Sequence, residues 1–321
     1  MEQEYAYLGL MRDIERSNIS SSTDISLVND IEECEICLLC RSYGTFGFFC
    51  DELKRDRKHF DKYFIYSIDD EDFPSLPGVY ACSPRRIHQQ QGWATTGHYI
   101  SSHITPFNFD CIPAEKRDIL FSFIGSSATH PVRKHLLALH HQDAVIQDSW
   151  AKGELPWWGR GDKIQQDYKQ NYREVVMRTR FALCPRGVSA ASIRLFEVME
   201  AGCVPVIISD ALILPRGPRW EDFILRVPEA DIERIPEIIG SCSEEFVVRS
   251  QAARQCWEQF YSPKASARTI LQEIQSLKSN LGERRDLLNS QVVHESFMAP
   301  YALRIRARSI KIKLRRMMKR I

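Results

Sequence analysis

Polar side chains interrupt an otherwise apolar stretch, CPRGVSAASIRLFEVMEAGCVPVIISD, a little past the middle of the chain. A helix that only filled a core would carry leucine where Arg194 and Glu197 stand, so a polar ligand is expected near its N-terminal end. The helix is predicted over about 189–201, and Ser189 or a neighbour can cap it. Its free backbone N–H groups carry partial positive charge, and Arg186 precedes them in the loop. Such a helix start suits a phosphate group.

Arg194 and Glu197 lie three residues apart and therefore share one face of the predicted helix. A carboxylate here could accept hydrogen bonds from both hydroxyls of a ribose. The motif thus indicates a nucleotide site. The alternative is an ordinary surface ion pair between the two side chains, worth on the order of 0.3 kcal/mol.

The elements around this motif alternate between strand and helix patterns. Near the N-terminus, ECEICLLCRSY and YFIYSI read as strands, with the charged segment DELKRDRKHFDKY as a surface helix between them. After a stretch expected to be irregular up to about Pro113, strands and helices alternate again. The later strands are ILFSFIGSS, DAVIQDS, RFALCP, VPVIIS and ILRV, and PVRKHLLALHH and IQQDYKQNYREVVMRTR are helices among them. This alternation predicts parallel sheets.

Two such sets predict an α/β chain with two Rossmann-like halves facing across a cleft, the usual place for a ligand. The boundary is expected near Glu115, so that the domains would be 1–114, 115–262 and a helical C-terminal extension at 263–321.

The composition is that of an ordinary soluble globular chain, with 44% hydrophobic and 26% charged residues. No apolar run approaches the roughly 20 residues that a membrane span requires. The opening MEQEYAYLGLMRDIERS is acidic where a secretory signal would be basic, so export is not expected. Ten cysteines are too sparse for a disulfide scaffold, which favours a cytoplasmic setting.

The last segment, residues 303–321, carries nine Lys and Arg and no acid, whereas the rest of the chain holds 34 basic and 42 acidic residues. The body of the protein is therefore no generic polyanion binder, and no nucleic acid is expected as a partner. Apolar residues recur in the segment at spacings of three or four. A basic amphipathic helix of this kind suits an anionic membrane surface; a solvated tail and a nucleic-acid-binding tail are the alternatives.

The stretch from Tyr172 to Glu229 resembles the exostosin-like glycosyltransferase family. It contains that family's strand, Pro-x-Gly loop, Ser-x-Arg-x-x-Glu helix and Gly-Cys-x-Pro-Val sequence. Upstream, FSFIGSSATHPVRKHLL resembles the family's Phe-x-Gly turn followed by an arginine, and DFPSLPGVY is similar to a turn of bacterial members. The loop departs from the pattern, because Ser189-Ala190-Ala191-Ser192 stands where members often have a Ser-Ser pair and a second glycine.

The resemblance implies a GT-B architecture, with the acceptor on the N-terminal half and a nucleotide sugar, UDP-linked by expectation, on the C-terminal half. Glu197 would bind the ribose, and Arg194 or Arg186 the diphosphate. Gly125 would let the strand turn approach the phosphates, and Arg133 would add charge. The loop residues Gly187, Ser189 and Ser192 complete the expected donor site. The acceptor would be a glycan or a lipid-linked sugar.

Inverting transfer, which most such enzymes use, needs one general base for the acceptor hydroxyl and a cationic site for the leaving diphosphate. Helix and arginines can meet the second need without a metal or another cofactor. The base is expected from the N-terminal half. Asp72 is the first candidate, followed by His98 or His103, since histidine titrates near neutral pH.

Several other signals leave alternatives open. Asp70 and Asp72 superficially match the metal-binding DxD motif of another glycosyltransferase class. Trp157 or Trp158 could stack a sugar ring or anchor a loop. Cys34, Cys37 and Cys40 have zinc-like spacing but are expected to be buried thiols. A scaffold or carbohydrate-binding protein that kept the fold and lost activity is the rival from another class.

Overall fold

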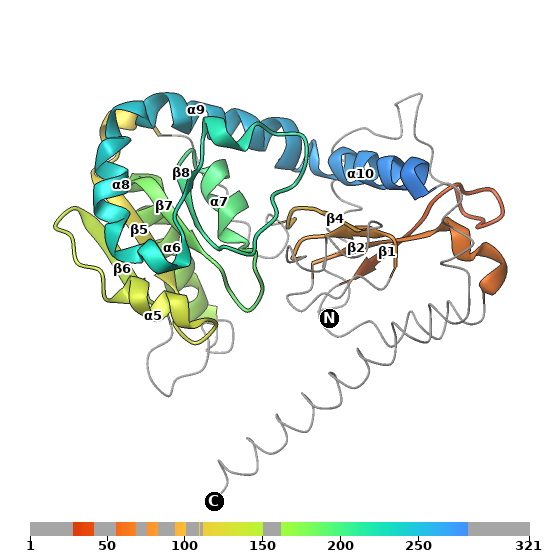
Figure 1. Ribbon diagram of the computed structural model, residues 1–321, viewed down its shortest axis with the longest axis horizontal. Helices are drawn as coiled ribbons and strands as arrows, with labels where there is room; N and C mark the ends of the chain where they lie inside the picture. Colours follow the sequence, from red (N-terminus) through yellow and green to blue (C-terminus); the bar gives the residue numbers. More distant parts are fainter. Residues whose placement is uncertain are drawn as a thin grey trace, which may run out of the picture.

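The computed structural model describes residues 28–41, 56–68, 76–82, 94–100, 109, 112–149 and 162–281. Within these ranges the chain forms two parallel β-sheets that lie side by side along the molecule (Figure 1). Together with the helices that cover them, the two sheets confirm the predicted α/β class. Among the described helices, none combines the length and the apolar composition needed to cross a bilayer.

The first sheet follows chain order, β1-β2-β3-β4, with all neighbours parallel. Its strands are β1 (Cys37–Arg41), β2 (Tyr63–Ser67), β3 (Gly78–Tyr80) and β4 (Ala94–Thr96). The 3₁₀ segment η3 (Arg57–Lys62) precedes β2. The expectation of an irregular stretch was wrong at β3 and β4, because three-residue strands are too short to show a period. Gly78 pairs closely with β2, where a Cβ would lie 2.0 Å from the Ile65 carbonyl oxygen.

The second sheet has the order β6-β5-β7-β8-β9 and is also parallel throughout. Its strands are β5 (Ile119–Gly125), β6 (Ala144–Asp148), β7 (Thr179–Pro185), β8 (Val204–Ile208) and β9 (Leu225–Arg226). β5, β6, β8 and β9 each fall within a segment predicted as a strand from its apolar run. β7 covers the predicted strand RFALCP and begins one residue earlier, at Thr179, where a helix had been expected to continue. Glu115 lies in η4 (Ala114–Lys116), between the last strand of the first sheet and β5.

Helices cover both faces of the second sheet. Apolar side chains of α5 (Pro131–Leu137) and α8 (Ile235–Ser241) pack on one face, against Phe121, Phe181 and Val206. Those of α6 (Asp162–Arg178) and α7 (Arg194–Glu200) pack on the other, against Ala182 and Cys184. The short segments η6 (Trp220–Asp222), η7 (Glu229–Arg234) and η8 (Ser243–Glu245) complete the connections.

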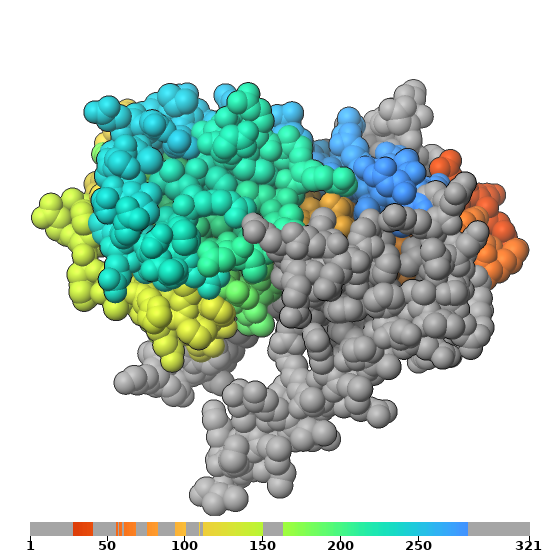
Figure 2. Space-filling view, viewed as in Figure 1, coloured from red at the N-terminus to blue at the C-terminus, as the bar shows by residue number. Residues whose placement is uncertain are grey.

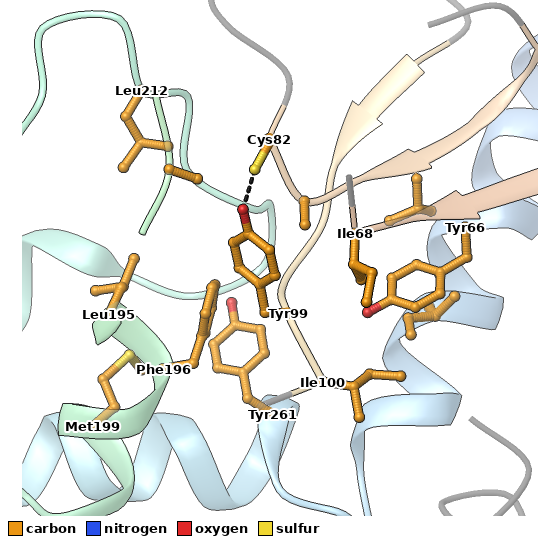
Figure 3. Close-up of a cluster of buried hydrophobic side chains, with 14 of the residues drawn as sticks. Tyr66, Ile68, Cys82, Tyr99, Ile100, Leu195, Phe196, Met199, Leu212 and Tyr261 are labelled. Atoms are coloured by element: carbon orange, nitrogen blue, oxygen red, sulfur yellow. Dashed lines mark hydrogen bonds between the residues drawn. The ribbon is translucent and has the colours of Figure 1, made fainter. Parts of the chain in front are cut away.

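The last described helices return the chain to the first sheet. α9 (Phe246–Cys256) continues through a π-helical turn, η9 (Trp257–Tyr261), into α10 (Ser266–Leu281). α10 packs on β3 and β4, burying Ile270 and Ile274, and appears in blue on the outer surface in the space-filling view (Figure 2). An apolar cluster joins the two parts: Leu195 and Phe196 of α7 lie on one side, Tyr66 of β2 on the other (Figure 3).

The helix after the motif loop is shorter than predicted. It begins at Arg194 rather than at Ser189, and in the described structure no side chain caps it. The Ser189 hydroxyl donates instead to the Cys82 carbonyl oxygen at 2.9 Å, which ties this loop to the end of β3. The Ser209 hydroxyl donates to the Ala190 carbonyl oxygen at 2.8 Å. These tertiary bonds hold the loop in a non-helical path, so the predicted serine cap was wrong.

Candidate functional site

The order of the second sheet reverses between β5 and β7. From β5 the chain passes outward to the edge strand β6 and then returns to β7 on the other side of β5. In open parallel sheets, ligands bind outside the carboxyl ends of the strands at such a reversal. Gly125 ends β5 and Pro185 ends β7, so the loop with Arg186 begins at this place. Topology thus singles out the position that the sequence motif occupies.

Arg133 on α5 spans this position. Its Nε donates to the Arg186 carbonyl oxygen at 2.8 Å, Nη1 to Ser126 O at 3.3 Å and Nη2 to Pro185 O at 3.4 Å. It is buried, and a Cβ on Gly187 would lie 3.3 Å from its Nη2. Arg133 therefore holds the loops after β5 and β7 through hydrogen bonds to their backbone carbonyl groups.

Arg194 brings a second buried guanidinium to the same point. It lies 4.9 Å from the Phe123 ring centroid and 5.6 Å from that of Tyr172. Its Nη2 donates to the Ile124 carbonyl oxygen, while its Nε has no hydrogen-bond partner among the described residues. Gly125 permits this approach, since a Cβ there would lie 3.0 Å from Arg194 Nη2. The alternative of a surface ion pair fails for Arg194, which is 8% exposed.

Arg186 is the most accessible of the three arginines, with 22% of its side chain exposed. Its Nη1 lies 3.6 Å from Glu229 Oε1, and its Nε has no partner among the described residues. The pKa of the neighbouring His130 is lowered, first by burial and then by the positive charge of the Arg186 guanidinium. This end of the sheet is suited to an anion.

Glu197 faces the same buried region from α7. It is 5% exposed, and its Oε2 accepts a hydrogen bond from the Tyr172 hydroxyl at 2.8 Å. Glu197 and Arg194 therefore contact the same aromatic side chain, whereas the sequence had suggested only that they share a helix face. Ser189 and Ser192 are both buried in the loop. The structure thus brings six of the predicted donor-site residues together at the carboxyl ends of β5 and β7: Gly125, Arg133, Arg186, Gly187, Arg194 and Glu197. The hydroxyl of a seventh, Ser189, is bonded to Cys82 instead.

His98 lies in the interior. It is 1% exposed, its Nε2 lies 2.8 Å from the Ser266 hydroxyl, and its ring packs 4.9 Å from that of Tyr261. Burial lowers the pKa of His98 to about 3. We therefore assign this imidazole a packing role rather than that of the general base.

Other predicted residues lie outside the described parts of the chain: Asp70, Asp72, His103, Trp157, Trp158 and the tail at 303–321. Cys34, Cys37 and Cys40 are all partly buried, and burial raises the pKa of Cys40 to about 12. Within the described ranges no three His, Cys, Asp or Glu residues gather as a metal site would require.

Sequence reasoning missed Tyr172, Phe123 and Glu229. Tyr172 and Tyr168 are four residues apart on an amphipathic helix, and their rings stack 6.2 Å apart. The spacing of the two tyrosines showed that they share a helix face, but it could not show that this face lies against Glu197 of α7. From the sequence, Phe123 was expected to be an ordinary core residue of its strand. In the structure both Arg133 and Arg194 lie against its ring. Glu229 lies after β9, at the start of η7, and belongs to no sequence motif that would have indicated a role in the site.

Comparison with known proteins gives this geometry a family context. Residues 86–242 match the exostosin GT47 domain, a range that contains Gly125, Glu197 and the three arginines but not Asp70 or Asp72. The chain is similar to the exostosin-1 homolog of Caenorhabditis elegans, at 30% identity over 45% of this chain and 41% of that protein. It is also similar to the probable glucuronosyltransferase GUT1 of Oryza sativa subsp. japonica, at 38% identity over 28% of this chain and 22% of that protein.

A third relative is the probable beta-1,4-xylosyltransferase IRX10 of Arabidopsis thaliana, with 37% identity over 27% of this chain and 22% of that protein. The chain thus spans less than half the length of these curated relatives.

Proposed function

We propose that this chain, an exostosin-like glycosyltransferase by its GT47 domain, transfers a sugar from a nucleotide donor to a glycan or lipid-linked acceptor. One observation carries the proposal: Arg133, Arg186 and Arg194 converge with Glu197 at the reversal of strand order between β5 and β7. A nucleoside diphosphate has the charges and hydroxyls that this set can recognise.

The proposed roles follow from exposure and charge. Arg186, the most accessible arginine, contacts the diphosphate directly. The buried guanidinium groups of Arg133 and Arg194 lie beneath the surface of the site and add positive charge. Their electrostatic effect is stronger at the low dielectric of the interior than it would be in water. Glu197 accepts hydrogen bonds from the ribose, and Gly187, Ser189 and Ser192 form the loop wall. Of the possible nucleotides, we expect UDP to be the one carried by the donor sugar.

The proposed chemistry is inversion without a metal. A base removes the proton of the acceptor hydroxyl, the oxygen attacks the anomeric carbon, and the bond to the nucleoside diphosphate breaks. The arginines stabilise the charge that develops on the leaving diphosphate. Asp72 is our candidate for the base. The metal-dependent alternative uses Asp70 and Asp72 and predicts that a chelator abolishes turnover.

The basic segment 303–321 is proposed to attach the protein peripherally to an anionic, cytoplasmic membrane face, where a lipid-linked acceptor would be available. Sedimentation with vesicles of phosphatidylserine and phosphatidylcholine tests this. The full chain should bind them, while removal of 303–321, or vesicles of phosphatidylcholine alone, should abolish binding. Equal binding in all three cases would contradict the proposal.

The central test is calorimetric titration with UDP, GDP and CMP in the presence of a chelator. Wild type should bind one of them, and Glu197→Ala should weaken that binding about tenfold or more, since a hydrogen bond to a charged group is lost. The matched control is Glu233→Ala, an exposed carboxylate on η7 that should leave binding unchanged. No binding by wild type would overturn the donor site, and binding without turnover of any nucleotide sugar would favour the scaffold alternative.

A further inference from the structure

Tyr172 on α6 touches both α7 residues of the proposed donor site. Its hydroxyl donates to Glu197 Oε2 at 2.8 Å, and its ring lies 5.6 Å from the Arg194 guanidinium carbon. These partners are 25 and 22 positions away in the chain, so only the packing of α6 against α7 brings them together. One side chain thus contacts the anion and the cation of the site.

The ring of Tyr172 is itself held in place. It is 2% exposed, stacks on Tyr168 at 6.2 Å and 13°, and meets the edge of Phe109 at 6.4 Å. A ring fixed on two sides directs its hydroxyl along one line, which is the direction of Glu197. Burial, and then the neighbouring Glu197 carboxylate, raise the pKa of Tyr172 well above its usual value, so the phenol keeps its proton and remains a donor.

A hydrogen bond from a neutral donor to a carboxylate is stronger than one between neutral groups. It occupies one lone pair of Oε2 and restricts the rotation of the carboxylate about its last bond. The carboxylate of Glu197 is then held in one orientation. Recognition of two adjacent hydroxyls requires such a fixed acceptor, because a rotating carboxylate would lose entropy on binding.

We infer that Tyr172 is a positioning residue for ribose recognition, acting through Glu197. This role rests on the proposed function, in which Glu197 binds the hydroxyls of the donor ribose. Tyr172 does not contact the nucleotide itself, and it is the ring of Tyr172, not its hydroxyl, that packs with Val175, Val176 and Val198 in the apolar cluster between α6 and α7. The hydroxyl and the ring therefore have separable tasks.

The test compares UDP with 2′,3′-dideoxy-UDP, which lacks both ribose hydroxyls. Calorimetry on wild type and Tyr172→Phe should show UDP affinity falling about tenfold in the variant, whereas affinity for the dideoxy compound stays within twofold. In a Glu197→Ala background, Tyr172→Phe should produce no further loss of UDP affinity, since the residue through which it acts is gone.

Tyr261→Phe is the matched control. Tyr261 is equally buried, but its hydroxyl has no hydrogen-bond partner among the described residues, so both nucleotides should bind as to wild type. Equal loss of both nucleotides in Tyr172→Phe, no loss of either, or an additive loss in the double variant would overturn the role of Tyr172 alone. If wild type binds none of UDP, GDP and CMP, the proposed function fails together with this inference; if it binds GDP or CMP instead of UDP, the same comparison is made with that nucleotide and its 2′,3′-dideoxy form.

Discussion

At the scale of single residues, two carboxylates one turn apart on α7 have different environments. Glu197 accepts a hydrogen bond from Tyr172, whereas Glu200 ends the helix, half-buried, and accepts one from the backbone N–H of Phe109. Burial raises the pKa of Glu200 to about 7, although the Phe109 bond and Arg254 act in the opposite direction. The ionised form of Glu200 therefore destabilises the fold, whereas Glu197 is a residue of the proposed donor site.

Replacing Glu200 by Gln should stabilise the protein above neutral pH. Its folded pKa lies above the unfolded value, so ionisation penalises the fold progressively as pH rises from about 4.5 to 7. Chemical unfolding at pH 8 should show a gain of about 1–3 kcal/mol for Glu200→Gln, and no gain near pH 4. The exposed Glu233→Gln serves as control. A gain independent of pH would show that ionisation is not its cause.

At the scale of elements, the site depends on how closely α7 approaches the end of β5. A Cβ on Gly125 would lie 2.8 Å from Phe123 Cζ and 3.0 Å from Arg194 Nη2. Both side chains are buried, and Arg194 is bonded to the Ile124 carbonyl oxygen, so neither can move without disturbing the other. The absence of a side chain at Gly125 is therefore a requirement of the site.

Gly125→Ala should displace Arg194 and weaken UDP binding about tenfold, with a loss of about 1–3 kcal/mol in the free energy of unfolding from overpacking. Titration calorimetry and urea unfolding measure the two effects. Gly240→Ala on α8 is the control, because nothing lies within 4 Å of its added Cβ. It should gain about 0.5–1 kcal/mol and bind UDP normally. Normal binding by Gly125→Ala would remove Arg194 from the site.

At the scale of the whole molecule, His98 links the two sheets and the final helix. It follows β4, its imidazole contacts Phe196 of α7 and Tyr261 of η9, and Ser266 at the start of α10 lies 2.8 Å from its Nε2. The Tyr66 hydroxyl donates to its carbonyl oxygen at 2.9 Å. A neutral imidazole at this junction is part of what holds the first sheet against the second part of the chain.

Acid should weaken this junction. The pKa of His98 is about 3 when folded and near 6.5 when unfolded, so its contribution is complete above pH 6.5 and is lost as pH falls toward 3. His98→Gln removes the titration, and its unfolding free energy should depend less steeply on pH between 6.5 and 4.5, by about 1–3 kcal/mol. The exposed His135→Gln should keep the wild-type slope. An unchanged slope in His98→Gln would contradict this assignment.

The sequence alone determined most local elements, the location of the motif and the resemblance to exostosin-like glycosyltransferases, with which the match of residues 86–242 to the exostosin GT47 domain agrees. These depend on nearby residues: an apolar run marks β7, and the spacing of Arg194 and Glu197 marks one helix face. Only the tertiary structure decided the sheet order, the existence of β3 and β4, and the late start of α7. It also decided the hydrogen bonds from Arg133 to the Arg186 carbonyl oxygen, 53 positions away, and from Tyr172 to Glu197. Such contacts arise when packing brings distant segments together, and no local period in the chain encodes them.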